Sequence, residues 1–131
     1  MEMVILIMKD ISVLIVDDLL FMRTAIKNIL ENNGITVAGE AENGLRAVQL
    51  YKIKKPDIVL MDITMPVMNG IKALDRIMQL DRQANVIMCS ALGQSRYIIK
   101  SIQLGAKDFV IKPFKAERIL SSIKKVLDID G

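Results

Sequence analysis

The sequence predicts an α/β protein: a doubly wound, five-stranded parallel sheet with helices on both faces. Five short apolar runs alternate along the chain with five segments in which apolar residues recur at helical spacing. Most of these runs are apolar at consecutive positions, which is typical of strands buried on both faces. The 131 residues suffice for one domain, expected over residues 11–128, and leave residues 1–10 as an N-terminal extension without an assigned role.

Glycine and proline mark the ends of several predicted elements. Gly34 and Gly105 follow helical segments, where glycine commonly ends a helix in the left-handed conformation. Pro56 ends the second helix, because a proline disfavours helical conformation in the residue before it, and Pro113 ends the fifth strand. In chain order the predicted elements are strand 11–16, helix 20–31, strand 35–41, helix 45–54, strand 57–62, helix 70–80, strand 85–91, helix 98–104, strand 108–112 and helix 116–127.

The composition excludes several kinds of site. The chain has no histidine, which removes histidine metal ligands and histidine acid–base chemistry. Cys89 is the single cysteine, so an internal disulfide is excluded, and its apolar neighbours indicate a buried structural thiol. The net charge of +3 is modest and dispersed, which argues against nucleic-acid binding. The apolar opening of the chain is too short to span a bilayer and lacks the marks of a secretion signal, so we expect a cytoplasmic protein without membrane insertion.

Polar residues end four of the five predicted strands. Asp17 and Asp18 follow the first strand, and Asp62 ends the third. Ser90 lies at the end of the fourth strand, and Lys112 at the end of the fifth. Parallel strands bring their carboxyl ends to one edge of the sheet, where ligands of such folds bind. Each residue also has an ordinary alternative role, with Asp18 as a helix cap, Ser90 as a turn hydroxyl and Lys112 as a solvated lysine.

As a set, these residues indicate phosphoryl transfer at a metal ion. Three carboxylates at one edge repel one another, and Mg²⁺ favours a few carboxylates together with waters and a phosphate oxygen. One carboxylate would then be the nucleophile. The metal and an ammonium group would neutralise charge on the transferring oxygens, and a hydroxyl would donate a hydrogen bond to one of them.

From Ile11 to about Asp128 the chain resembles the receiver domain of two-component response regulators. Neighbouring stretches, such as the one from Cys89 to Gln94, are similar to the single-domain chemotaxis regulators of the CheY kind. The resemblance implies a flavodoxin-like fold with strand order 2-1-3-4-5. The features that carry it are Asp17-Asp18, Asp62 with Met65-Pro66 and Asn69-Gly70, Ser90-Ala91, Phe109, and Lys112-Pro113-Phe114.

The resemblance also implies a role for each residue. Asp62 would be the phosphoacceptor, Lys112 would pair with the bound phosphoryl group, and Ser90 would move to bond it. Phe109 would swing into the space that Ser90 leaves and rearrange the face made by the fourth helix, fifth strand and fifth helix. The Lys112–Pro113 bond is expected to be cis. The expected Mg²⁺ ligands are the carboxylates of Asp17, Asp18 and Asp62 and the backbone carbonyl of Thr64.

The same resemblance implies which partners the protein would have. A CheA-like histidine kinase would be the phosphodonor, and a flagellar or archaellar motor-switch or adaptor protein would receive the output, with a phosphatase as a further possible partner. The protein would be a monomer and a phosphoacceptor that catalyses its own phosphoryl transfer and slow dephosphorylation, rather than an enzyme acting on a separate substrate.

Three positions depart from the usual family pattern. Phe109 replaces the more common tyrosine, so packing must drive its inward position. Thr64 and Leu92 stand two residues after Asp62 and Ser90, and neither can orient an attacking water as an amide or carboxylate would. We therefore expect slow loss of the phosphoryl group. Val67 places an apolar side chain where polar residues are frequent, and we interpret it as slack in the loop rather than a partner contact.

Four other functions are alternatives to this one. A phosphorelay intermediary fits the same residues, and the detached receiver of a transcription regulator is disfavoured because no helix-turn-helix follows residue 128. A small phosphohydrolase would need a second acid where Thr64 stands. A flavin binder would need a phosphate loop after the first strand, and Asp17 and Asp18 would repel that phosphate.

Overall fold

The computed structural model describes residues 10–91 and 93–129 and confirms the predicted fold. Its sheet is parallel, with strands in the order β2-β1-β3-β4-β5. The predicted extension lies outside the described residues, apart from Asp10. The strands are β1 (Ser12–Val16), β2 (Thr36–Ala41), β3 (Ile58–Asp62), β4 (Val86–Ser90) and β5 (Asp108–Ile111). The helices are α2 (Leu20–Asn32), α3 (Gly44–Lys54), α4 (Gly70–Leu80), α5 (Ser95–Leu104) and α6 (Ala116–Val126).

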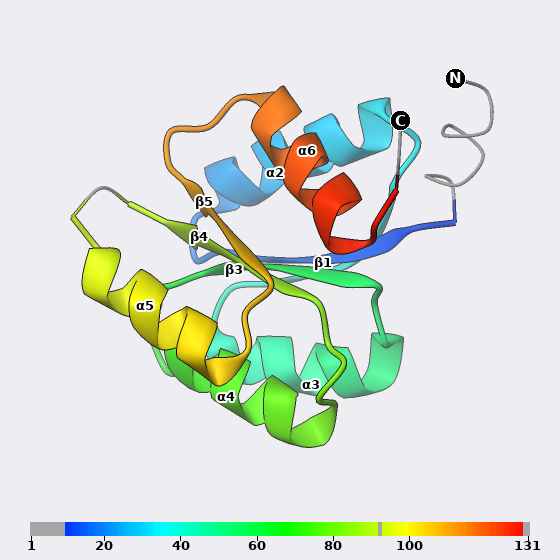
Figure 1. Cartoon of the computed structure of the whole chain (residues 1–131). Coiled ribbons are helices and arrows are strands. Elements are labelled where there is room, and N and C mark those ends of the chain that lie inside the picture. The colour runs from blue at the N-terminus through cyan, green and yellow to red at the C-terminus, as the bar shows by residue number, and fades with distance from the viewer. Residues whose placement is uncertain (1–9, 92, 130–131) are drawn as a thin grey trace.

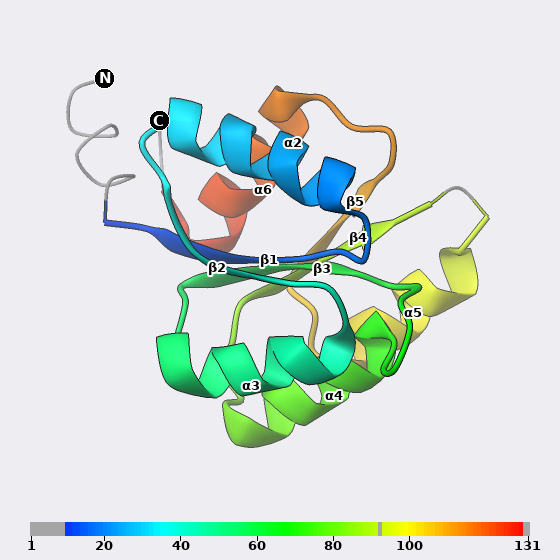
Figure 2. The same ribbon diagram turned by 180° about the vertical axis from the view of Figure 1, so that it is seen from behind.

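The helices form one layer on each face of the sheet. Helices α2 and α6 cover one face, and α3, α4 and α5 cover the other (Figures 1 and 2). Successive side chains of a strand point to opposite faces, so each central strand contributes to both layers. The direction of winding changes between β1 and β3, whose carboxyl ends therefore flank the crevice where such sheets bind ligands.

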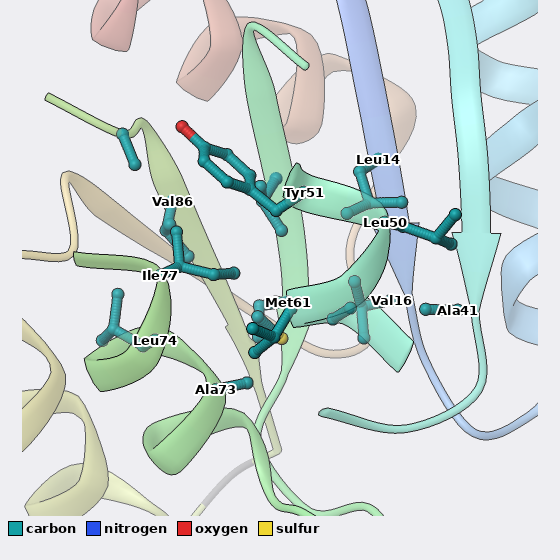
Figure 3. Packing of buried hydrophobic residues seen from close by; sticks show 14 of the residues in the cluster. Leu14, Val16, Ala41, Leu50, Tyr51, Met61, Ala73, Leu74, Ile77 and Val86 are labelled. Carbon is teal, nitrogen blue, oxygen red and sulfur yellow. The ribbon is translucent and has the colours of Figure 1, made fainter. Parts of the chain in front are cut away.

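Two apolar clusters result, one on each side of the sheet. Leu14, Val16 and Met61 face α3 and α4, where they meet Leu74 and Ile77 (Figure 3). On the opposite side, residues of β1 and β3 pack against α2 and α6, and the central members are Val13, Ile15, Leu60, Ile26, Leu30, Ile119 and Ile123. Because β1 and β3 are covered on both faces, the acids at their ends extend from a rigid part of the molecule.

The predicted element bounds agree with the structure to within a few residues. Gly105 ends α5 in the left-handed conformation, with φ of 112°, as its position predicts. Helix α5 nevertheless differs from the other helices, because Ser101 is its only fully buried residue while Ile99 and Ile102 are 60% and 53% exposed. None of the described helices is long and apolar enough to cross a membrane.

The loop between β3 and α4 is held against the sheet by two glycines. The Gly70 N–H donates to the carbonyl of Ile63 at 2.7 Å, and the Gly44 N–H donates to the carbonyl of Met68 at 2.9 Å. A Cβ at Gly70 would overlap the carbonyl oxygen of Asp62, and one at Gly44 would lie 2.5 Å from the carbonyl oxygen of Met68. Both glycines are therefore required by close backbone contacts, and both contacts fix the loop that follows Asp62.

The close contact at Gly70 can be tested with alanine. Gly70→Ala should lower the free energy of unfolding by at least about 2 kcal/mol, because the new Cβ must displace backbone rather than a flexible side chain. The control is Gly39→Ala in β2, where a Cβ would lie at ordinary contact distances of 3.6 and 3.7 Å from two leucine side chains. Urea unfolding of both variants measures the difference. Equal stabilities would contradict this account of the loop.

Candidate functional site

Three carboxylates meet at the carboxyl edge of the sheet, as the sequence predicts. Asp17 and Asp18 follow β1 and Asp62 ends β3, and the three residues offer oxygens that lie within 4.8 Å of one another. Asp17 is 1% exposed, the side chain of Asp62 is 13% exposed, and Asp18 lies at the surface. The cluster is therefore a partly buried acidic cup that opens toward solvent on the side of Asp18.

Asp17 is fixed by hydrogen bonds to both of its carboxylate oxygens. The Leu19 N–H donates to Oδ1 at 2.9 Å, and Lys112 Nζ donates to Oδ2 at 2.7 Å. The alternative role of Asp18 as a helix cap is wrong, because Leu19 is the N-cap of α2 and makes no side-chain cap bond. Asp18 is left with its carboxylate at the rim of the cup.

Lys112 reaches into the cluster from the end of β5 and contacts two acids. Its Nζ lies 2.7 Å from Asp17 Oδ2 and 3.2 Å from Asp62 Oδ1. Burial lowers the pKa of Lys112, but the hydrogen bond to Asp17 and the two nearby negative charges outweigh burial and raise that pKa above its usual value. The residue is therefore charged at neutral pH and is not the solvated surface lysine of the ordinary alternative.

The negative charge of Asp62 is less well compensated by nearby donors than the negative charge of Asp17. Burial raises the pKa of the Asp62 carboxyl above its usual value, and the charge of Asp17 raises it further, although Lys112 acts in the opposite direction. The cluster thus holds three carboxylates, and one ammonium group contacts two of them. Hard oxygen ligands with excess negative charge are what Mg²⁺ prefers, so the residues present fit the predicted metal. The role of the Thr64 carbonyl as a further ligand remains a prediction.

Ser90 lies beside this cluster with its hydroxyl unpaired. It ends β4, and the neighbouring Cys89 is the register partner of Asp62 across the sheet. Ser90 is fully buried, and among the described residues its Oγ is the only buried side-chain oxygen or nitrogen without a hydrogen-bond partner. Such a group costs about 1–3 kcal/mol unless a partner arrives, so this hydroxyl is a donor available to an incoming oxygen.

Phe109 lies on β5, two strands from Asp62. It is paired in register with Met88 of β4, and its carbonyl accepts a hydrogen bond from Arg118 of α6 at 2.8 Å. Phe109, Ile111 and Phe114 line an open groove of about 400 Å³ on this side of the molecule. The Lys112–Pro113 bond next to this groove is cis, as the resemblance implies.

Cys89 is next to Ser90 on β4. Burial raises the pKa of the Cys89 thiol to about 12, so the thiol is protonated at neutral pH and structural, as predicted.

Val67 is 78% exposed and has φ of 67°, a rare conformation for a β-branched residue. It is the centre of a three-residue turn in which the Met68 N–H donates to the Pro66 carbonyl at 2.7 Å. Leu92 lies outside the described residues.

Gln94 was missed by the sequence reasoning and bridges the two loops that flank Asp62. Its Oε1 accepts a hydrogen bond from the Ala91 N–H at 2.7 Å, and its Nε2 donates to Thr64 Oγ1 at 3.0 Å. Gln94 also stands immediately before α5, where its backbone rather than its side chain caps the helix. A glutamine at that position was the only signal in the sequence, and it is a weak one.

With the fold and the acidic cluster defined, the chain can be placed among known proteins. Residues 13–124 match the model of the response regulator receiver domain, and the chain belongs to that family. Relatives include the chemotaxis protein CheY of Bacillus subtilis, which is 58% identical over 88% of this chain and 97% of its own length. CheY of Thermotoga maritima is 54% identical over 87% of this chain and 95% of its own length.

Solved structures agree with this assignment. CheY in the CheX–CheY–BeF3–Mg²⁺ complex from Borrelia burgdorferi has a TM-score of 0.86 and 39% identity, with 89% of each chain covered. The response regulator domain of Thermotoga maritima CheB has a TM-score of 0.84 and 37% identity, over 92% of this chain and 98% of that one. The chain is thus a CheY-like receiver, consistent with two-component signalling in chemotaxis.

The raised pKa of Asp62 predicts that its negative charge lowers stability at neutral pH. The folded protein binds the proton of this carboxyl more tightly than the unfolded chain, where the pKa is near 3.8. Between those two pKa values the free energy of unfolding therefore falls as pH rises. In Mg²⁺-free buffer, Asp62→Asn should unfold at a higher urea concentration than the wild type at pH 7, and the difference should shrink in acid. Asp10→Asn, at an exposed acid outside the cluster, is the control. A less stable Asp62→Asn would contradict this prediction.

Proposed function

We propose that this chain is a CheY-like response regulator of chemotaxis or motility signalling, with Asp62 as its phosphoacceptor. The observation that carries the proposal is the arrangement around Asp62. Lys112 Nζ contacts both Asp62 and Asp17, and the buried hydroxyl of Ser90 at the end of the adjacent strand lacks a partner. A phosphoryl group on Asp62 would bring oxygens for both donors.

The proposed reaction is phosphoryl transfer from a phosphohistidine of a partner histidine kinase. A carboxylate oxygen of Asp62 forms a P–O bond while the P–N bond to the imidazole breaks, and the imidazole nitrogen takes up a proton. Asp17, Asp18, Asp62 and the Thr64 carbonyl would hold Mg²⁺, which when bound neutralises charge on the transferring oxygens. Lys112, whose Nζ lies 3.2 Å from Asp62 Oδ1, contributes a further positive charge.

The change of charge supplies the signal in this proposal. A phosphoryl group adds about −1.5 to −2 charge to a cluster that already has an excess of carboxylates. New hydrogen bonds and ion pairs would compensate that charge, and the unpaired hydroxyl of Ser90 and the ammonium group of Lys112 would form them. Their different contacts in the two states bias the protein toward an altered arrangement of Ser90 and Phe109.

The output face in this proposal is formed by α5, β5 and α6. Its exposed apolar side chains include Ile99, Ile102 and Ile111, which are 60%, 53% and 41% exposed. A motor-switch or adaptor protein would cover them. The relatives that are 54–58% identical are chemotaxis proteins matched over 95–97% of their length, and this supports a motility role. The protein would work in the cytoplasm as a phosphoacceptor rather than as an enzyme with a separate substrate.

Labelling of Asp62 tests the proposal directly. Incubation with Mg²⁺ and acetyl phosphate should produce an acid-stable, hydroxylamine-sensitive acyl phosphate, because the nucleophile is a carboxylate. Asp62→Asn should remain unlabelled under the same conditions, and the control Asp10→Asn should label like the wild type. Intact-protein mass spectrometry measures both outcomes. Absent labelling of the wild type, or persistent labelling of Asp62→Asn, would refute the assignment.

The lifetime of the phosphorylated protein is a separate prediction. Thr64 lies at the mouth of the site with its hydroxyl bonded to Gln94, and it has no amide or carboxylate to orient an attacking water. Dephosphorylation should therefore be slow, and Thr64→Asn should shorten the lifetime several-fold by supplying an amide. Thr64→Val, which is matched in size, should not shorten it. Decay after removal of acetyl phosphate gives the rate, and a wild-type half-life of a few seconds would contradict the prediction.

A further inference from the structure

The side chain of Gln94 ties together the two loops on either side of the phosphoacceptor. Its amide oxygen accepts from the Ala91 N–H at 2.7 Å, and its amide nitrogen donates to the Thr64 hydroxyl at 3.0 Å. Ala91 follows Ser90 directly, and Thr64 stands two residues past Asp62. Because Asp62 and Cys89 are register partners, this bridge spans the ends of β3 and β4 just beyond the Asp62–Cys89 pair.

The bridge is formed while the neighbouring hydroxyl is left unpaired. Ser90 Oγ is buried without a partner, although its backbone carbonyl accepts from the Lys112 N–H at 2.7 Å. An unpaired buried hydroxyl is unfavourable, so other contacts must stabilise the arrangement that keeps it there. Gln94 makes two such contacts, and one of them holds the residue next to Ser90.

The Ala91 N–H is also a hydrogen-bond donor that a phosphoryl oxygen could use. It is a backbone donor that directly follows the end of β4, the strand next to that of Asp62, and Gln94 Oε1 occupies it. A phosphoryl group on Asp62 presents three oxygens that need donors. Lys112 Nζ and Ser90 Oγ are two donors near the carboxylate. The Ala91 N–H is the next one along β4, and it becomes available only when Gln94 releases it.

We infer that Gln94 is a positioning residue that stabilises the unphosphorylated protein, because its amide holds the Ala91 N–H and the Thr64 hydroxyl until a phosphoryl group on Asp62 displaces it. This inference rests on the proposed function of Asp62. It adds a competition: the phosphoryl group gains the Ala91 N–H only by displacing Gln94 Oε1, and this displacement also releases the residue next to Ser90.

Beryllofluoride with Mg²⁺ is the probe, since beryllofluoride bound to a carboxylate occupies the position of a phosphoryl group. Gln94→Met keeps the length of the side chain and removes both hydrogen bonds. It should bind beryllofluoride about three- to tenfold more tightly than the wild type, because the competing bonds are gone. Thr64→Val, which removes one of the two bonds, should give a smaller gain. Gln103→Met, at an exposed position in α5, is the matched control and should leave the affinity unchanged. Titration followed by amide NMR measures all four affinities.

The outcomes distinguish a failure of the role of Gln94 from a failure of the proposed function. Tighter binding by Gln94→Met, with a cooperative melting transition slightly below that of the wild type when beryllofluoride is absent, supports the inference, since structural damage to the loop would weaken binding instead. Unchanged or weaker binding by Gln94→Met, with normal binding by the wild type, overturns the role of Gln94 and leaves Asp62 as the phosphoacceptor. If the wild type itself fails to bind beryllofluoride, or if Asp62→Asn binds it equally well, the proposed function fails and the inference fails with it.

Discussion

An imbalance of charge at the carboxyl edge of the sheet is the constraint on which the rest of this structure depends. Asp17, Asp18 and Asp62 lie close to one another, and the ammonium group of Lys112 contacts only Asp17 and Asp62 among them. Carboxylates at this separation would move apart if the backbone allowed it. Strands β1 and β3 are covered on both faces by aliphatic side chains, and Gly70 packs against the carbonyl of Asp62, so the acids stay where the strands place them. The apolar layers therefore hold together a cluster of charges that is unfavourable by itself.

The same edge holds a donor without an acceptor. Ser90 is buried beside a group of carboxylates, yet its hydroxyl bonds none of the described residues. In the proposed function a cation would compensate the carboxylates, and a phosphoryl oxygen would accept a hydrogen bond from the hydroxyl. A buried hydroxyl without a partner, the only such side-chain group among the described residues, is typical of a functional site. The left-handed conformation of Val67 in the adjoining loop belongs to the same region.

The fold and the principal site residues could be predicted because topology alone brings them together. Parallel strands end at one edge, and the strand order that the family resemblance implies places β3, β4 and β5 side by side, so Asp62, Ser90 and Lys112 were expected to meet. Two features could not be obtained in this way. The bridge made by Gln94 depends on where a side chain lies between two loops, and no periodicity encodes it. The apolar residues of α5 have helical spacing, but spacing does not reveal that Ile99 and Ile102 face solvent.

Only strand β4 lies between the strand that ends in Asp62 and the exposed apolar face formed by α5, β5 and α6. The Lys112 N–H donates to the Ser90 carbonyl, so the end of β5 is bonded to the strand end that carries the unpaired hydroxyl. Three residues before Lys112, Phe109 borders the groove beside α6, and Arg118 bonds its carbonyl. A displacement of Ser90 would therefore reach Phe109 through one strand pair rather than through the core. Contact alone does not make a switch, because a ligand shifts an equilibrium only by the difference in its contacts with the two states. Ser90 and Lys112 are the residues whose contacts would differ most, since one lacks a partner and the other shares its charge between two acids.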